Sequence, residues 1–243
     1  MDCQSDWCGM MAITRSLSVV LPMFNEERAI TGTLENVSSY LTKSGALYEI
    51  IVVDDGSKDG SVGAVNSLIK KGALIKLIQH SHNQGYGEAL WTGFNAARLE
   101  RILLMDSDGQ FRIESVEQLW PFADEFDVVV GTRRNRADGG LRRMFSWGYT
   151  LLINLLFGLS LKDIGCGFKL FKREVWVKIQ PINSRDHKIF TVEWMWRLKQ
   201  RGVKIKEVAV THFSRQGGRP TGARWDVVWQ MLKALVALRS QRG

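Results

Sequence analysis

The first half of the chain alternates short apolar runs with segments in which apolar residues recur every three or four positions. A short apolar run is typical of a buried strand, and the second pattern is typical of a helix with one buried face. Asn25 stands where the cap of the first such helix is expected. The predicted strands are 17–21, 49–53, 74–79, 101–105 and 128–131, and the predicted helices are 26–42, 61–71 and 85–100.

Repeated strand–helix–strand units with nearly continuous apolar strands predict an α/β fold, in which a mainly parallel sheet is covered by helices. In such sheets ligands bind beyond the carboxyl ends of the strands. Three of these ends carry polar sequence: PMFNEE follows the first strand, DDGS the second and DSDGQ the fourth. We therefore expect a ligand site where these loops meet.

The DSDGQ segment has the composition of a divalent-cation site. Asp106 and Asp108 alternate along an extended chain and so point the same way, and Gln110 adds a neutral oxygen. Two close carboxylates repel each other unless a cation lies between them, and hard oxygen ligands suit Mg²⁺ or Mn²⁺. For this segment alone, a polar turn with an aspartate cap is the alternative.

The DDGS turn offers carboxylates that can accept hydrogen bonds from a base or a ribose, although Ser57 and its neighbours can equally cap the next helix. The later Gly85-Tyr86-Gly87 matches only part of a dinucleotide fingerprint, because Leu90 stands where the third glycine belongs. This segment is better suited to a close backbone approach at a helix start, near a phosphate.

Cationic residues gather in two later segments. Arg142 and Ser146 are four residues apart, share one face of a helix, and with Arg133 can hold a phosphate through charge-assisted hydrogen bonds. Arg215 and Arg219 flank two glycines and form a second cationic segment suited to a diphosphate. A solvated basic surface is the alternative for the first segment.

Glu193 begins a helix rich in aromatic and basic residues. It can act as a base, orient an acceptor, or pair with Arg197 four residues later. The histidines His82, His187 and His212 lack metal-binding spacing, so we expect them to make ordinary surface hydrogen bonds.

The overall charge narrows the class of partner. The 243 residues carry 33 Lys and Arg against 25 Asp and Glu, a net charge of +8. On charge alone, nucleic acid, anionic lipid and phosphorylated small molecules all qualify. With 4 Pro and 3 Cys, the composition excludes a disulfide-rich scaffold. The cysteines are odd in number and two of them, Cys3 and Cys8, lie in a polar N-terminal tail, so we expect a reducing compartment. The N-terminus also lacks the cationic and apolar regions of a signal peptide.

The chain is predicted to have three parts: a flexible tail over 1–16, one globular domain over 17–222 and an amphipathic helix over 223–243. The helix rests on 225–239, where apolar residues at helical spacing are mixed with basic ones, as in helices that lie on membrane surfaces. The uncharged stretch 144–161 is interrupted by polar residues, which favours a buried or membrane-surface helix over a span. Packing on the core or on another subunit is the alternative for both helices.

Taken in order, these motifs resemble family 2 glycosyltransferases of the dolichyl-phosphate mannose synthase type. The resemblance spans residues 17–222 and rests on PMFNE at 22–26, VVDDGS at 52–57, DSDGQ at 106–110, GTR at 131–133, DIGCGFK at 163–169 and Phe190-x-x-Glu193. It implies a GT-A fold, in which a Rossmann-like, mainly parallel sheet flanked by helices carries a nucleotide-sugar site. Two departures are Phe24, where the family often has Tyr, and Pro220-Thr221 in place of a Ser-Lys pair.

By that resemblance, three groups of side chains carry the reaction. The nucleoside of the donor is held by Pro22, Phe24, Glu26, Val53 and Asp55. The divalent ion and the diphosphate are held by Asp106, Ser107, Asp108, Gln110 and Arg215. The phosphate of the acceptor is held by Arg133, Arg142 and Ser146. Catalytic roles fall to Asp108, Arg133, Arg215 and, for a hydroxyl acceptor, Glu193.

The implied activity is the inverting transfer of a hexose from GDP-mannose or a UDP-hexose to a polyprenyl phosphate, such as dolichyl or undecaprenyl phosphate. The resemblance implies a Mg²⁺ or Mn²⁺ cofactor, a cytoplasmic enzyme that is peripheral on an anionic membrane surface, and no nucleic-acid partner. A phosphate acceptor is already ionised near pH 7 and needs no dedicated base. A family member acting on a hydroxyl acceptor is the alternative, and a binding module without catalysis is a third possibility.

Overall fold

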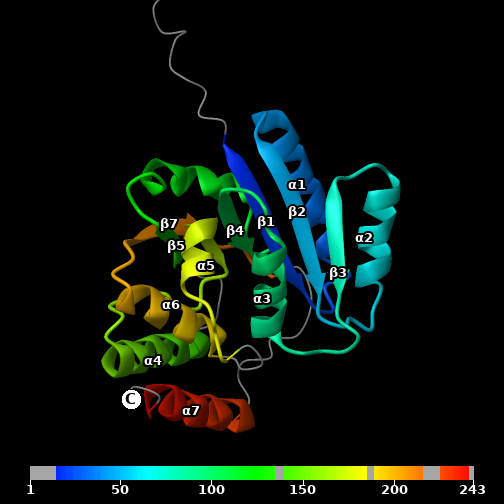
Figure 1. Cartoon of the computed structure of the whole chain (residues 1–243). Coiled ribbons are helices and arrows are strands. Elements are labelled where there is room, and N and C mark those ends of the chain that lie inside the picture. Colours follow the sequence, from blue (N-terminus) through cyan, green and yellow to red (C-terminus); the bar gives the residue numbers. More distant parts are fainter. Residues whose placement is uncertain (1–14, 135–139, 185–188, 216–224, 241–243) are drawn as a thin grey trace, which may run out of the picture.

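The computed structural model describes residues 15–134, 140–184, 189–215 and 225–240, with only the backbone described for 140–146 and 225–232. Within these residues, seven strands form a single sheet (Figure 1). The strands are β1 (Ser16–Met23), β2 (Leu47–Asp54), β3 (Ile75–Gln79), β4 (Arg101–Met105), β5 (Val128–Arg134), β6 (Phe168–Lys172) and β7 (Ile205–Thr211).

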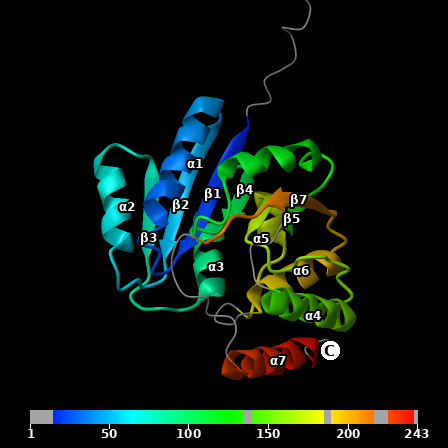
Figure 2. The ribbon, with the colours of Figure 1, turned by 180° about the vertical axis from the view of Figure 1, so that it is seen from behind.

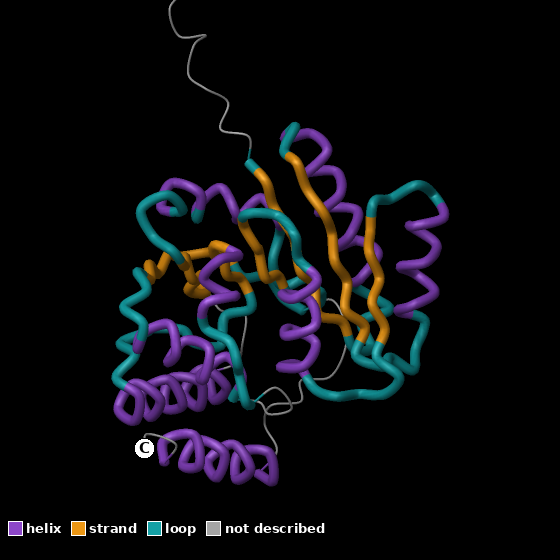
Figure 3. Tube along the Cα trace, in the orientation of Figure 1, coloured by secondary structure: helices purple, strands orange, loops and turns teal. Residues whose placement is uncertain are grey.

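The sheet is parallel except at one strand. Its order is β3-β2-β1-β4-β6-β5-β7, and only the two pairs that involve β6 are antiparallel. The predicted α/β fold with a mainly parallel sheet is therefore confirmed, and the trace in Figure 3 shows helices around a central set of strands. Because β6 is reversed, its first residue Phe168 pairs with Met105, the last residue of β4. The loop that enters β6 therefore meets the loop that leaves β4.

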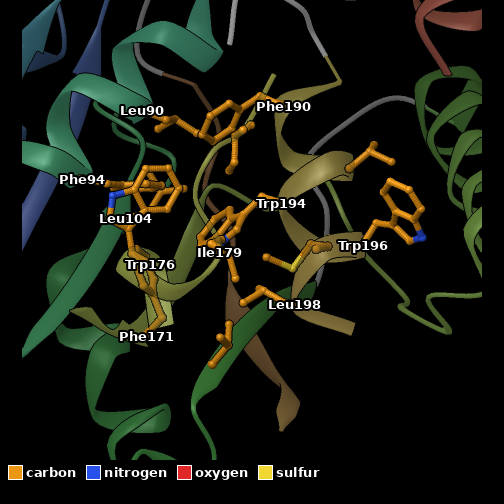
Figure 4. Packing of buried hydrophobic residues seen from close by; sticks show 14 of the residues in the cluster. Leu90, Phe94, Leu104, Phe171, Trp176, Ile179, Phe190, Trp194, Trp196 and Leu198 are labelled. Carbon is orange, nitrogen blue, oxygen red and sulfur yellow. The ribbon is translucent and has the colours of Figure 1, made fainter. Parts of the chain in front are cut away.

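Both faces of the sheet are buried, as the continuous apolar runs predict. Neighbouring residues of β1 point to opposite faces, so Val20 belongs to one buried cluster and Val19 to the other. Each fully buried aliphatic side chain stabilises the fold by about 1.5–3 kcal/mol. The first cluster includes an aromatic group, drawn in Figure 4, in which the ring of Phe94 lies edge-on to Phe171 and Trp176 at centroid distances of 5.0 and 5.1 Å.

Helices divide between the two faces, as Figure 2 shows from behind. One face packs against α1 (Ile30–Ser44), α2 (Ser61–Lys70) and the short 3-10 helices η1 (Ile113–Gln118) and η2 (Trp120–Phe122). The residues buried on the other face form one cluster with those of α3 (Tyr86–Ala96), α4 (Gly140–Phe157), α5 (Arg173–Lys178), α6 (Phe190–Gln200) and α7 (Trp225–Ser240), and α7 lies beyond α4 at the lower end of Figure 1. Among the described residues, no helix combines the length and the apolar character needed to cross a bilayer.

The close packing of α3 on the sheet depends on a glycine. A Cβ atom added at Gly93 would lie 2.3 Å from Cγ1 of Val20, far inside van der Waals contact. The helix can therefore approach β1 only because this position has no side chain. This contact brings the N-terminal end of α3, with Tyr86, to the carboxyl edge of the sheet.

The five predicted strands are all present, but the predicted cap of the first helix is wrong. The helix begins at Ile30, and its cap position is Ala29. Asn25 instead adopts a positive φ of 55°, and its Oδ1 accepts a hydrogen bond from the amide of Lys58 at 2.8 Å. The side chain thus joins the loop after β1 to the loop after β2. It bonds to the amide of Lys58 and not to an amide of its own helix.

Candidate functional site

The loops that leave the strands converge on one edge of the sheet, the lower edge in Figure 1, where β1 ends. The predicted meeting of the loops after β1, β2 and β4 is confirmed by contacts between them. The amide of Asn25 donates to Oγ of Ser57 at 2.9 Å, and Oγ of Ser107 donates to the carbonyl of Pro22 at 2.6 Å. The ends of β5 and β7 and the start of β6 lie at the same edge. We refer to this region as the donor edge.

Asp106 and Asp108 form the acidic centre of the donor edge. The hydroxyl of Tyr86 donates to Oδ1 of Asp106 at 2.8 Å, and the amide of Gln110 donates to Oδ1 of Asp108 at 3.0 Å. Burial, followed by the negative charge of Asp108, raises the pKa of Asp106 above its usual value. The charge of Asp108 therefore disfavours the ionised form of Asp106, and a cation between the two side chains would relieve this.

Gly167, directly before β6, makes room for the carboxylate of Asp106. A Cβ atom at this glycine would lie 1.8 Å from Oδ2 of Asp106, and the amide of Asp106 donates to the carbonyl of Gly167 at 3.1 Å. The loop is supported from below by Lys169, which is 1% exposed and donates to the carbonyl of Cys166. Burial lowers the pKa of this lysine. The segment DIGCGFK at 163–169 is one of the motifs that carry the family resemblance, but no role was predicted for its second glycine, Gly167.

The residues present fit a hard divalent cation. The side-chain nitrogen Nε2 of Gln110 donates to the carbonyl of Phe213 at 3.4 Å, so the side-chain oxygen Oε1 is the atom available as a ligand. Across the described ranges, no three His, Cys, Asp or Glu side chains gather as a metal site. A cation at this edge would therefore combine the oxygens of Asp106, Asp108 and Gln110 with those of a substrate, as Mg²⁺ commonly does.

Arg215, four residues after β7, reaches into the acidic centre. Its guanidinium bonds to Oε1 of Glu26, and its Nη1 lies 3.7 Å from Oδ2 of Asp108. Burial raises the pKa of Glu26 to about 7, although Arg215 acts in the opposite direction. The structure thus brings together a predicted nucleoside residue, a predicted metal ligand and a predicted diphosphate contact.

Arg133 lies at the end of β5 and is held by Asp163. Its Nε and Nη2 donate to the two carboxylate oxygens of Asp163, each at 2.7 Å. Oε1 of Glu207 accepts hydrogen bonds from the amides of Lys162 and Asp163 at 2.7 and 3.3 Å, which fixes the loop that carries this carboxylate. Planar bidentate pairing of this kind orients a guanidinium closely.

The predicted nucleoside residues differ in what they present at the donor edge. Phe24 is 39% exposed, so its ring can stack against a base. Pro22 is buried and is tied to Ser107 through its carbonyl. Val53 is fully buried in the core, where Cγ2 lies beside Gly93 of α3. The side chain of Val53 therefore packs against the helix and is not presented at the edge.

Asp55 follows β2 and accepts hydrogen bonds from the loop between β3 and α3. Oδ1 accepts from Nδ1 of His80 and from the amide of Gln84, and Oδ2 accepts from the amide of Gly85. The motifs predict no role for His80, although its place directly after a predicted strand was the available signal. Gly85 has a positive φ of 99°, consistent with the close backbone approach expected at the start of α3.

Glu193 lies in the core, away from solvent. It is 0% exposed, and its oxygens accept hydrogen bonds from the amides of Asn183 and Ser184 and from Nε of Arg197, the last at 2.6 Å. Of its three predicted roles, the structure shows the pairing with Arg197. The carboxylate also anchors the backbone at 183–184, which the sequence did not indicate.

The remaining predictions divide between described and undescribed residues. His212, expected at the surface, is 5% exposed and lies edge-on to Phe111 at 5.3 Å, so that expectation is wrong. His82 is exposed and bonds to Ser81 at 3.1 Å, as expected. The positions that fall outside the described residues or side chains are the tail over 1–14, Arg142, Ser146, His187 and Arg219.

Comparison with known proteins adds a family and several relatives. Residues 18–179 match the model of the family described as Glycosyl transferase family 2. The chain is 32% identical over 206 residues to a dodecaprenyl-phosphate galacturonate synthase of Rhizobium johnstonii, a match that covers 83% of this chain and 60% of that protein. It is 29% identical to the dolichyl-phosphate beta-glucosyltransferase of Dictyostelium discoideum, covering 92% of this chain and 73% of the relative. The predicted family 2 is therefore confirmed. The resemblance was to the mannose synthase type, whereas the names of these two relatives specify galacturonate and glucose.

Solved structures support the fold. Glucosyl-3-phosphoglycerate synthase of Mycobacterium tuberculosis, crystallised with Mn²⁺, uridine diphosphate and phosphoglyceric acid, superposes with a TM-score of 0.72 at 22% identity, covering 93% of this chain and 78% of that one. Mannosyl-3-phosphoglycerate synthase of Rubrobacter xylanophilus gives a TM-score of 0.67 at 19% identity, covering 93% and 73%. The predicted GT-A fold is confirmed by these similarities.

Proposed function

The chain belongs to glycosyl transferase family 2, and from that premise we propose that it transfers a hexose from a nucleotide diphosphate sugar to a polyprenyl phosphate, with inversion. One observation carries the proposal: the carboxylates of Asp106 and Asp108 share the donor edge with the guanidinium groups of Arg133 and Arg215. This combination suits a diphosphate leaving group and an anionic acceptor. The names of the two relatives, both built on a polyprenyl phosphate, support the class of acceptor.

The reaction needs charge stabilisation more than proton transfer. An oxygen of the acceptor phosphate attacks the anomeric carbon, the bond from that carbon to the donor's β-phosphate oxygen breaks, and the nucleoside diphosphate leaves with the electron pair. Arg215 lies where it can move from Glu26 and Asp108 to the leaving diphosphate. Mg²⁺ or Mn²⁺ held by Asp106, Asp108 and Gln110 supplies further positive charge to that diphosphate when bound.

The burial of Glu193 favours a phosphate acceptor over a hydroxyl acceptor. A hydroxyl nucleophile normally requires a general base within hydrogen-bond reach. Glu193 was the candidate for that role, but its carboxylate is fully buried and bonded to its own chain. We therefore assign it a positioning role. A phosphate monoester is already ionised near neutral pH and reacts without such a base.

An exposed apolar stripe supports a peripheral place on a membrane. Trp147, Leu151 and Leu155 recur every four residues along α4 and are 68%, 43% and 75% exposed, and Val236 of α7 is 67% exposed. Residues at this spacing share one face of a helix. Both helices lie toward the lower edge of Figure 1, where the donor edge is. We propose that this stripe contacts the lipid surface in which the acceptor resides.

Transfer of labelled sugar tests the proposed reaction. A panel of UDP- and GDP-hexoses with Mn²⁺ should yield a solvent-extractable product on a short polyprenyl phosphate, and Asp108→Asn should abolish it. Asp124→Asn, which alters an aspartate that is 81% exposed and paired with Arg101, is the matched control and should retain activity. Arg142→Ala should severely reduce transfer to the phosphate acceptor. Transfer to a hydroxyl acceptor but not to polyprenyl phosphate would refute the proposal.

Flotation with anionic phospholipid vesicles tests the membrane contact. Leu155→Glu should reduce the vesicle-bound fraction, because the charge would enter the lipid interface. Leu74→Glu alters a leucine that is 71% exposed, between α2 and β3, and should leave binding unchanged. Equal loss in both variants, or in neither, would contradict the assignment of the stripe.

A further inference from the structure

The carboxylate of Asp55 has little hydrogen-bonding capacity left. Oδ1 accepts from Nδ1 of His80 and the amide of Gln84, both at 2.8 Å, and Oδ2 accepts from the amide of Gly85 at 2.8 Å. An ionised carboxylate offers about four acceptor positions, two on each oxygen. Oδ1 is therefore full, and one position on Oδ2 has no donor among the residues that the structure describes.

Two hydrogen-bond partners fix the orientation of the His80 ring toward Asp55. Its Nε2 lies 3.0 Å from Oγ1 of Thr92 on α3, so both ring nitrogens have partners. Because the ionised carboxylate only accepts, Nδ1 must carry a hydrogen. The side chains of His80 and Asp55 are 8% and 5% exposed, so solvent has little room to replace either partner.

The backbone around this group is also fixed in place. Gly56 has a positive φ of 74°, and a Cβ atom there would lie 2.6 Å from the carbonyl carbon of His82. The turn after β2 therefore presses directly against the loop after β3. This close contact keeps the amides of Gln84 and Gly85 within reach of Asp55.

Asp55 lies beside the loop that carries Phe24, at the end of the donor edge where the nucleoside is proposed to bind. The amide of Asp55 donates to the carbonyl of Met23 at 2.8 Å, directly before the exposed ring of Phe24. For this carboxylate to bind the base, a base stacked on Phe24 must turn its hydrogen-bonding edge toward Asp55. The number of N–H donors on that edge of the base then decides whether each of them finds an acceptor on Asp55.

Resting on the proposed function, we propose that His80 is a specificity-determining residue that restricts the donor nucleotide to uracil. The pairing edge of uracil has one N–H between two carbonyl oxygens, which matches the one open position on Oδ2 of Asp55. Guanine presents two adjacent donors, N1–H and N2–H, which bind a carboxylate through both oxygens. With Oδ1 filled by His80 and Gln84, the second guanine donor would be desolvated without an acceptor, and such a group is costly to bury. His80 acts through Asp55 and touches no reacting atom.

Calorimetric titration of the full chain with UDP and with GDP, each with Mn²⁺, tests this inference without any turnover. The unmodified chain should bind UDP at least about 10-fold more tightly than GDP, the ratio expected for one unsatisfied donor against a charged partner. His80→Phe keeps a ring but removes the donor, so it should reduce the ratio by about 10-fold. His80→Asn places an amide N–H near the position of Nδ1 and should preserve the ratio.

Each outcome decides the matter. GDP binding as tight as UDP binding in the unmodified chain would overturn the proposal, as would equal weakening of both nucleotides in His80→Phe with an unchanged ratio. If His80→Phe does not fold, Thr92→Val, which frees the ring of His80, should narrow the ratio in its place. Binding of neither nucleotide would refute the nucleotide-sugar activity as well. A UDP preference without transfer to polyprenyl phosphate would support base selection and refute only the proposed acceptor.

Discussion

Gly167→Ala is a direct test of how the acidic centre is held. The added Cβ would lie 1.8 Å from Oδ2 and 2.2 Å from Cγ of Asp106, whereas ordinary van der Waals contact begins at 3.4 Å. Neither Gly167 nor its neighbour Gly165 has a positive φ, so alanine is not strained by the backbone at either position. The effect of the substitution therefore falls on the carboxylate.

The size of the displacement sets the expected loss. Asp106 must move by about 1.6 Å to restore ordinary contact, and its backbone cannot separate from Gly167 without losing the 3.1 Å hydrogen bond between them. Misplacement of a catalytic group by about 1 Å can reduce the rate about 100-fold. We expect kcat/KM to fall at least about 100-fold and Mn²⁺-dependent nucleotide binding to weaken, while overpacking lowers the free energy of unfolding by about 1–3 kcal/mol.

Gly165→Ala is the matched control in the same loop. Among the described residues its Cβ would meet only Nη2 of Arg133, at an ordinary 3.7 Å, so kcat/KM should stay within about twofold of the unmodified chain. Transfer rates, nucleotide titrations with Mn²⁺ and urea unfolding should be measured on both variants. Full Mn²⁺-dependent activity in Gly167→Ala, or equal losses in the two variants, would refute the assigned role of this glycine.

Three further substitutions, one of them with a matched control, probe stability. Glu193→Ala leaves Arg197 and the amides of Asn183 and Ser184 without their acceptor, so the free energy of unfolding should fall by about 3–5 kcal/mol in urea titrations; normal stability with abolished transfer would instead indicate a catalytic carboxylate. Because the pKa of Glu26 is about 7 in the fold against a usual 4.5, the fold binds this proton more tightly than the unfolded chain does, and the free energy of unfolding should fall as pH rises from 4.5 to 7. Glu26→Gln should flatten that slope in urea titrations at several pH values, and an unchanged slope would contradict the shifted pKa. Gly56→Ala should lower the free energy of unfolding by more than about 1 kcal/mol because of its positive φ and close contact, whereas Gly63→Ala, with open space in α2, should not; thermal unfolding of both distinguishes the positions, and equal effects would argue against strain at Gly56.

Strands buried on both faces were predictable because such burial leaves an uninterrupted apolar run, whereas β7, parallel to β5 and mostly half-buried, was not predicted. β1, β2 and β4 carry that signal, and their positions follow from it. The sequence of β6, FKLFK, lacks this apolar run, because its two lysines are typical of a half-exposed strand. Lys169 is buried nevertheless, since backbone carbonyls of the preceding loop accept its hydrogen bonds. A local pattern cannot report such a partner, so the reversed strand was not predicted.

The site was predictable where its members are neighbours in sequence. Asp106 and Asp108 lie two residues apart after one strand, and that spacing indicated their chemistry. Tyr86, His80 and Gly167 reach the same edge from other parts of the chain, so their roles depend on strand order and on the reversal of β6. Spacing allowed Glu193 to pair with a residue four positions later, but nothing in the spacing indicates complete burial.

The bond between Arg215 and Glu26 joins residues 189 positions apart. A ribosome delivers the N-terminal end first, so the half of the sheet built from β1 to β4, including both aspartates of the acidic centre, emerges well before this arginine. Nucleotide capture would then be among the last capacities that a nascent polypeptide gains. A product truncated before β7 would keep Glu26, Asp106 and Asp108 but lack Arg215, so the contacts of this guanidinium with Glu26 and Asp108 would be missing.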